Sequence, residues 1–203
     1  MAKIALFGTS ADPPTRGHQE ILMWLADRFD RVAVWAADNP LKSGQTPLEH
    51  RSAMLRLLIE ELAVSRKNLG FYPEISHPRT IETLEKSQKM WPNDSFTLTI
   101  GSDLIGQLFQ WYRAEELLKQ VDILVVPRSG YHLDNGKLEM IRQRGTCVSI
   151  AENLQVPAVS STEYRETGKN AVTPPIIEAY IQSKNLYRYQ DIPTNNASTL
   201  GKR

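Results

Sequence analysis

Near its start the chain reads Lys3-Ile4-Ala5-Leu6-Phe7-Gly8-Thr9-Ser10-Ala11-Asp12-Pro13-Pro14-Thr15-Arg16-Gly17-His18, an apolar run followed by a turn rich in Gly and Pro. The apolar run predicts a buried strand, and apolar residues from Ile21 to Phe29 then recur at helical spacing. A strand that enters a helix through such a turn brings backbone N–H groups and the positive end of a helix dipole to one place. This arrangement favours a phosphate-binding turn, although an ordinary strand-to-helix connection has the same turn chemistry.

Apolar segments alternate with amphipathic ones along the rest of the chain. Further strands are predicted at 31–36, within 69–72, and at 96–100, 121–126 and 146–150. Helices are predicted after the capping pattern of Thr46 to Glu49, at 80–84, within 104–119 and after Thr173. Parallel strands need crossover connections, so the alternation predicts a doubly wound α/β fold with a parallel sheet. One domain over 1–189 is expected, followed over 190–203 by a flexible tail with little apolar content.

The composition limits the classes of function. Of 203 residues, 41% are hydrophobic and 23% are charged, and the formal net charge is +1. So small a net charge argues against general binding of nucleic acid or of a membrane surface. An anionic ligand would therefore bind at a local cluster of positive charges or hydrogen-bond donors. No apolar run approaches the roughly 20 residues that span a bilayer, which predicts a soluble protein. A single cysteine, Cys147, and the lack of an apolar leader before the first strand favour the cytoplasm.

Polar segments follow the predicted strands at their carboxyl ends, where open parallel sheets bind ligands. These segments are Asp38 to Lys42, Gly101-Ser102-Asp103, Pro127 to Tyr131 and Val159 to Arg165. Structural alternatives exist, because Lys42 and Arg51 could be solvated charges, Asp103 a helix cap and Trp111 a core residue. Ser160 and Glu163 match a capping box, and a capped helix start with hydroxyl groups and a nearby Arg also suits phosphate.

Two resemblances extend this interpretation. Thr15-x-Gly17-His18 is similar to the (H/T)-x-G-H signature of the nucleotidyltransferase superfamily. Over about residues 3–189, the order of the motifs resembles that of the bacterial nicotinate-nucleotide adenylyltransferases. The motifs are Gly8-Thr9-x-x-Asp12-Pro13-Pro14 with Gly17-His18, Lys42 with Arg51 and Met54, Thr80-Ile81-Glu82-Thr83-Leu84, Gly101-Ser102-Asp103, Trp111-Tyr112, Arg128-x-Gly130-Tyr131, Ser160-Ser161-Thr162-x-x-Arg165, and Tyr180-Ile181 before Leu186-Tyr187.

The resemblance implies a Rossmann-like nucleotidyltransferase fold and adenylyl transfer from ATP to nicotinate mononucleotide, giving deamido-NAD and pyrophosphate in NAD biosynthesis. It implies His18, Lys42 and Arg165 as catalytic residues. The ATP phosphates would meet Gly8, Thr9, Thr15, Gly17, His18, Ser160, Ser161, Thr162 and Arg165. The mononucleotide would meet Thr80, Asp103, Trp111 and Tyr112, with the indole stacked on the pyridine ring. Mg²⁺ would be bound mainly through the ATP phosphates, without a protein metal site, and a homo-oligomer is left open.

The chemistry of this reaction suits such a residue set. The attacking phosphate is already ionised at neutral pH, so the site must position charges and stabilise them rather than supply a base. His18 is expected to donate a hydrogen bond, preferably as imidazolium. Three positions depart from the family pattern, where Thr15 replaces a usual His, Ala11 a usual Phe, and Pro78-Arg79 a common Ser-Tyr.

Two alternatives fit the same motifs. One is an adenylyltransferase for another phosphate monoester, such as nicotinamide mononucleotide or phosphopantetheine. The other is a non-catalytic sensor that binds ATP without turnover. His18, Lys42 and Arg165 together argue against the sensor, because a pure binder has no need of donors directed at a leaving group.

Overall fold

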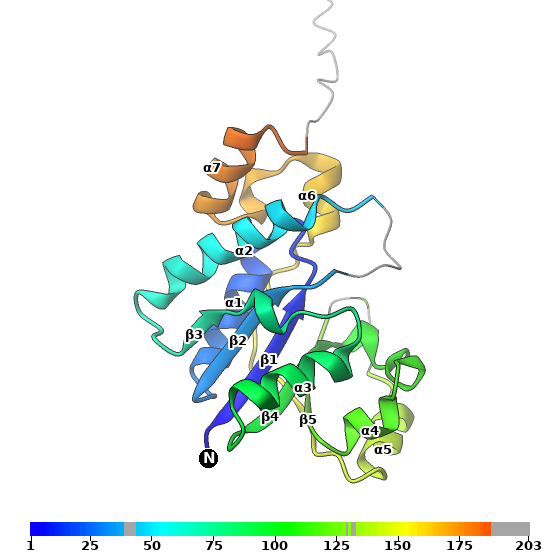
Figure 1. The fold of residues 1–203 in the computed structure, drawn as a ribbon. Coiled ribbons are helices and arrows are strands. Elements are labelled where there is room, and N and C mark those ends of the chain that lie inside the picture. Colours follow the sequence, from blue (N-terminus) through cyan, green and yellow to red (C-terminus); the bar gives the residue numbers. More distant parts are fainter. Residues whose placement is uncertain (39–43, 129, 131–132, 188–203) are drawn as a thin grey trace, which may run out of the picture.

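The computed structural model describes residues 1–38, 44–128, 130 and 133–187. Its centre is a six-stranded sheet in the order β3-β2-β1-β4-β5-β6, and each neighbouring pair of strands is parallel. The strands are β1 (Lys3–Thr9), β2 (Arg31–Ala36), β3 (Leu69–Phe71), β4 (Ser95–Gly101), β5 (Asp122–Val126) and β6 (Val148–Ile150). This confirms the doubly wound parallel sheet, with β1 in its middle (Figure 1).

Helices cover both faces of the sheet. They are α1 (Arg16–Ala26), α2 (Leu48–Ala63), α3 (Thr80–Met90), α4 (Ala114–Leu118), α5 (Asn135–Arg142), α6 (Ser161–Thr167) and α7 (Pro175–Lys184). Side chains of a strand alternate between the faces, so Ala5 and Phe7 of β1 lie in one core and Ile4 and Leu6 in the other. The first core packs under α1, α2, α6 and α7, and the second under α3, α4 and α5 (Figure 1).

Several local predictions need correction. The helix expected after a Thr46 cap begins at Leu48, and its N-cap is Pro47 with no side-chain capping bond. Thr46 instead uses its backbone, donating to Asp12 and accepting from Arg51. The helix-rich stretch expected at 104–119 contains a short 3₁₀ turn at Leu108–Gln110 and only the five-residue helix α4. The tail expected at 190–203 lies outside the described residues.

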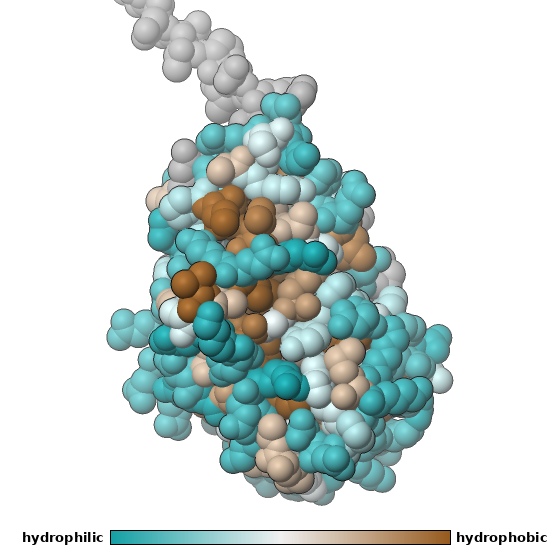
Figure 2. All heavy atoms as spheres, turned by 60° about the vertical axis from the view of Figure 1, so that its left-hand side comes forward, coloured by the Kyte–Doolittle hydropathy of each residue, from teal (hydrophilic) through white to brown (hydrophobic). Residues whose placement is uncertain are grey.

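The order of the strands indicates where on the sheet a ligand would bind. β1 pairs with β2 on one side and with β4 on the other, so the chain connections at the ends of β1 and β4 run to opposite faces. A crevice between such strand ends is where doubly wound proteins bind ligands. On the face turned forward in Figure 2, hydrophilic side chains break the apolar surface into separate areas. Within the part of the chain that the structure describes, no helix combines the length and apolarity needed to cross a membrane.

Candidate active site

The predicted phosphate turn lies at the carboxyl end of β1, beside the end of β4. β1 ends at Thr9, and Thr15 is the N-cap residue of α1, with an extended backbone. The neighbouring strand β4 ends at Gly101. The start of α6 reaches the same turn, because the Ser161 hydroxyl donates to the carbonyl oxygen of Pro13 at 2.8 Å. The fold thus joins segments that lie 148 residues apart in the sequence.

His18, in the first turn of α1, is held by the end of β1 and by its own helix start. Its Nδ1 accepts a hydrogen bond from the backbone N–H of Thr15 at 3.0 Å and lies 2.9 Å from the Thr15 hydroxyl. Its Nε2 lies 3.0 Å from the hydroxyl of Thr9. A ring nitrogen that accepts from a backbone N–H carries no proton, so this network places the proton of the neutral ring on Nε2. These contacts define both the orientation and the tautomer of His18.

The charge state of His18 differs from the expectation. Burial, and then the positive charge of Arg128, lowers the pKa of His18 from 6.5 to about 4. The ring is therefore neutral at pH 7, and the expectation of an imidazolium is wrong for the free protein. Its neutral form still offers Nε2–H as a hydrogen-bond donor. Arg128 follows β5 and is 110 positions from His18 in the chain (128 − 18), so no local motif reports this effect.

Gly8 and Gly17 make room for protein side chains. A Cβ atom on Gly8 would come within 2.6 Å of the Trp35 indole. A Cβ atom on Gly17 would lie 3.1 Å from Val156 and 3.9 Å from Val159. The absence of a Cβ atom at Gly17 therefore lets α1 pack closely against the segment after β6. Contact between phosphate and the backbone of these two glycines stays a prediction.

The start of α6 lies against the turn after β1. Ser160 accepts a hydrogen bond from the backbone N–H of Glu163 at 3.0 Å, which confirms the predicted helix cap. Arg165 donates to the carbonyl oxygen of Asp12 at 2.6 Å and to the Thr162 hydroxyl at 3.1 Å. The Arg165 side chain is 37% exposed, so part of the guanidinium faces solvent beside the turn. The structure thus brings this predicted catalytic residue to the predicted phosphate site.

Asp12 links the turn after β1 to other segments of the chain through its carboxylate. Its carboxylate is buried, and its Oδ1 accepts a hydrogen bond from the Tyr187 hydroxyl at 2.6 Å. Its Oδ2 accepts from the backbone N–H of Thr46 at 3.3 Å and lies 3.9 Å from Arg165. Burial, and then the bond to Asp12, raises the pKa of Tyr187 above its ordinary value. Tyr187 therefore ties the segment after α7 to the turn, a contact that the sequence did not predict.

Arg51 is buried, which overturns its interpretation as a solvated charge. It is 1% exposed on α2, and its guanidinium donates to three backbone carbonyl oxygens, those of Thr46 at 2.8 Å, Ser10 at 3.0 Å and Ala37 at 2.7 Å. It also donates to the carboxylate of Asp38 at 3.2 Å. Arg51 thus joins the chain after β1 to the chain after β2, and its charge is paired as a buried charge must be.

Asp103 and Arg128 form an ion pair beside the end of β4. Arg128 donates to Asp103 Oδ2 at 2.8 Å, and the Arg128 backbone N–H donates to the Ser102 hydroxyl at 3.0 Å. The other oxygen, Asp103 Oδ1, is buried and has no hydrogen-bond partner among the described residues. Gly101 makes this geometry possible, because a Cβ there would collide with Asp103 Oδ1. Arg128 carried no assigned role in the sequence, although it lay in a quoted motif.

Of the residues predicted to bind the mononucleotide, Thr80 and Trp111-Tyr112 come from two segments that meet. Thr80 is the first residue of α3, whose N-cap residue, Arg79, makes no side-chain capping bond. The N–H group of Glu82 donates to the carbonyl oxygen of Arg79 at 3.0 Å, so the N–H groups of Thr80 and Ile81 are the ones in this first turn without a hydrogen-bond partner among the described residues. Tyr112 is 50% exposed, and the Arg79 guanidinium lies 4.2 Å from its ring centroid. Trp111 is partly buried and packs against the second core, so it has a structural role in addition to the predicted binding role.

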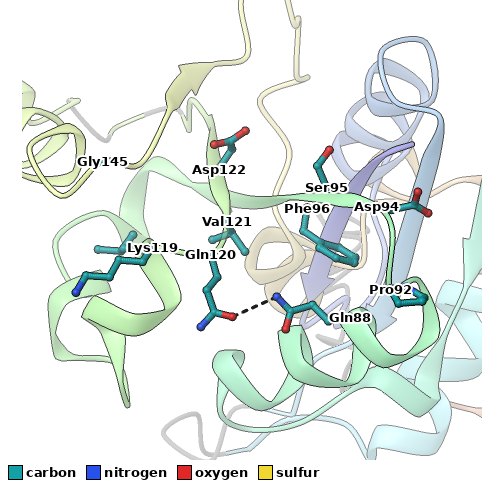
Figure 3. A pocket seen from close by; sticks show the side chains of 11 residues that line it. Gln88, Pro92, Asp94, Ser95, Phe96, Lys119, Gln120, Val121, Asp122 and Gly145 are labelled. Carbon is teal, nitrogen blue, oxygen red and sulfur yellow. Dashed lines mark hydrogen bonds between the residues drawn. The ribbon is translucent and has the colours of Figure 1, made fainter. Parts of the chain in front are cut away.

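Lys42, the third predicted catalytic residue, lies outside the described residues. Two hollows in the described surface contain none of the predicted site residues. One, of about 390 Å³, lies at the amino ends of β4 and β5, at the opposite edge of the sheet from the phosphate turn, and the Gln88–Gln120 hydrogen bond of 3.2 Å crosses it (Figure 3). The other, of about 510 Å³, lies beside the edge strand β6. The second hollow is lined by Arg28 and Arg142, but it contains none of the residues of the phosphate turn.

Known proteins with similar sequences belong to the family that the motifs of the site resemble. A family model described as Cytidylyltransferase-like matches residues 6–167. A "Probable nicotinate-nucleotide adenylyltransferase" from Synechocystis sp. is 39% identical over 198 residues, covering 92% of this chain and 99% of the relative. A "Nicotinate-nucleotide adenylyltransferase" from Bacillus subtilis is 27% identical over 197 residues, with coverage of 92% and 99%.

Solved structures show the same fold. A Plasmodium falciparum nicotinic acid mononucleotide adenylyltransferase complexed with NaAD superposes with a TM-score of 0.76 at 21% identity, covering 92% of this chain and 98% of that one. The same enzyme complexed with APC gives a TM-score of 0.75. The sequence identity is low, so these structures support only the assignment of the fold. With the family model and the relative at 39% identity, they lead to one conclusion: the chain belongs to the nicotinate-nucleotide adenylyltransferases of the Cytidylyltransferase-like family.

Proposed function

We propose that the protein transfers the adenylyl group of ATP to nicotinate mononucleotide, giving deamido-NAD and pyrophosphate in NAD biosynthesis. One observation carries the proposal. A neutral His18 is held by Thr9 and Thr15 at the carboxyl end of the central strand, with Arg165 bound to the same turn. This arrangement offers hydrogen-bond donors and positive charge to a polyphosphate. The reaction requires no protein nucleophile, because the attacking group is the phosphate of the mononucleotide itself.

The reaction can be written around this geometry. A phosphate oxygen of the mononucleotide attacks the α-phosphorus of ATP and forms a new P–O bond. The bond from that phosphorus to the oxygen bridging to the β-phosphate breaks, and pyrophosphate leaves with the electron pair. His18 would donate Nε2–H to an oxygen that gains charge, with the ATP oxygen taking the place of the Thr9 hydroxyl as acceptor. Arg165 and Lys42 would balance the phosphate charge.

Mg²⁺ would be carried by the phosphates of the nucleotide. Within the described ranges, no group of three or more His, Cys, Asp or Glu side chains could hold a metal ion. Asp103 Oδ1 is a buried carboxylate oxygen without a partner in the described part of the chain, and it could accept a hydrogen bond from a water of a hydrated ion or from a ribose hydroxyl. When bound to the phosphates, Mg²⁺ would neutralise part of their charge.

The mononucleotide would occupy the side of the crevice formed by α3 and by Trp111-Tyr112. Its pyridine ring would stack on Trp111, whose packing against the core keeps the indole in place. Its carboxylate would accept hydrogen bonds from the free N–H groups near Thr80 and from the backbone of Tyr112. Asp103 would lie between the two nucleotides.

Pyrophosphate release with a panel of acceptors tests the proposal. We expect turnover with ATP and nicotinate mononucleotide, and slower turnover with nicotinamide mononucleotide. Pyrophosphate release only with phosphopantetheine would refute the substrate assignment. ATP binding, measured separately by calorimetry, without turnover on any acceptor would show a nucleotide sensor instead.

Compartment and assembly are separate proposals. We place the protein in the cytoplasm, where ATP and pyridine mononucleotides are available, and fractionation of cells tests this. A homo-oligomer is compatible with an enzyme of this kind, and light scattering on the purified protein would establish the oligomeric state.

A further inference from the structure

Arg79 is a positive charge in an unfavourable place. It is the N-cap residue of the 11-residue helix α3, at the positive end of the helix dipole, where a cation is repelled. Among the described residues, no carboxylate pairs with its side chain, whose guanidinium contacts the Tyr112 ring at 4.2 Å. Arg113, the next residue after Tyr112, is by contrast neutralised by Glu85 and Glu116. An anion at this helix start would pair with the exposed Arg79 guanidinium and accept hydrogen bonds from the N–H groups of Thr80 and Ile81.

We propose that Arg79 is the specificity-determining residue that makes the site prefer a carboxylate on the pyridine ring. This inference rests on the proposed function, because it assigns Arg79 to the mononucleotide side of that site. Arg79 immediately precedes Thr80, whose helix start is where the carboxylate is proposed to bind. Stacking on Tyr112 holds the guanidinium beside this position and lowers the conformational entropy that binding would otherwise remove.

The charge acts on both competing substrates. The rings of nicotinate and nicotinamide mononucleotide are both positively charged pyridinium ions, but only the first carries a carboxylate beside that charge. The Arg79 guanidinium therefore attracts the carboxylate of the first substrate. It repels the uncompensated ring of the second, so one residue supplies both an attractive and a repulsive element of specificity. Backbone N–H groups alone carry only partial charges and do not add this repulsion.

The experiment compares kcat/KM for the two mononucleotides in the full-length enzyme and in variants of Arg79. Arg79→Gln keeps a polar side chain and removes the charge. We expect it to lower kcat/KM for nicotinate mononucleotide about three- to tenfold while leaving that for nicotinamide mononucleotide unchanged or raised. Arg79→Lys keeps the charge and should retain most of the preference. Arg31→Gln is the matched control, because Arg31 lies 5.0 Å from the Trp91 ring at the amino end of β2, far from the site.

The dependence of the substrate preference on ionic strength distinguishes a charge effect of Arg79 from a purely structural role of this residue. Raising the ionic strength from about 0.02 to about 0.3 M should reduce the preference of the wild-type enzyme and leave that of Arg79→Gln nearly constant. An unchanged preference in Arg79→Gln, or an equal loss with both substrates, would overturn the inference while leaving the proposed function intact. A wild-type enzyme that does not use nicotinate mononucleotide would instead refute the proposed function itself.

Discussion

The lowered pKa of His18 makes the stability of the fold depend on pH. The pKa is about 4 in the folded protein and 6.5 for an unperturbed histidine, which represents the unfolded chain. Between these values the unfolded state binds more protons than the folded state. The free energy of unfolding therefore falls as the pH falls from 6.5 towards 4, and the ring contributes no such loss above pH 7. The perturbation to test is acidification, with and without the imidazole.

The expected magnitude follows from the two pKa values. The full difference corresponds to about 3 kcal/mol, and about 2 kcal/mol of it should appear between pH 7 and pH 5. Urea unfolding of the wild type and of His18→Gln at both pH values measures it, since Gln removes the titrating group at similar size. We expect the wild type to lose about 2 kcal/mol more than the variant over this interval. Equal losses in the two proteins would refute the assignment of a neutral, partly buried ring.

Kinetics provide an independent check of the same charge state. Because the ring is already neutral at pH 6, kcat should show no decline with a midpoint near 6.5 between pH 6 and pH 8. A tenfold fall in kcat per pH unit above 6.5 would mean that the bound enzyme uses an imidazolium after all. His18→Ala should lower kcat by about 10² and leave ATP binding nearly unchanged, because the donor acts mainly in the transition state.

Three further substitutions test the contacts around the site. Thr15→Val removes the hydroxyl 2.9 Å from His18, and we expect kcat/KM to fall about three- to tenfold, with about 1 kcal/mol lost in urea unfolding. Full activity with lowered stability would mean that Thr15 does not orient the ring. Arg51→Leu leaves buried carbonyl oxygens unpaired and should cost about 3 kcal/mol or more of unfolding free energy; a loss under 1 kcal/mol would contradict its structural role. Gly101→Ala should displace Asp103 and raise KM for the mononucleotide about tenfold, while circular dichroism shows a folded protein.

Local sequence was enough where the controlling interactions are local. The apolar run from Lys3 to Phe7 and the periodic segment after His18 predicted β1 and α1, because strand and helix periodicity are properties of neighbouring residues. Ser160 and Glu163 predicted the start of α6 for the same reason, since a helix cap joins residues only three positions apart. The segment 104–119 was harder, because its apolar side chains fill a core beside irregular backbone and carry no clean period.

The sequence by itself also placed the phosphate turn, the motif order and the polar strand ends at one edge of a parallel sheet. Only the tertiary structure decided the charge of His18, the burial of Arg51 and the anchoring of Asp12 by Tyr187. In each case the partners come from segments that are remote in the chain. The pKa of a side chain, or the choice between a solvated and a buried charge, depends on desolvation and on nearby charges in space, and these exist only once the segments have packed together.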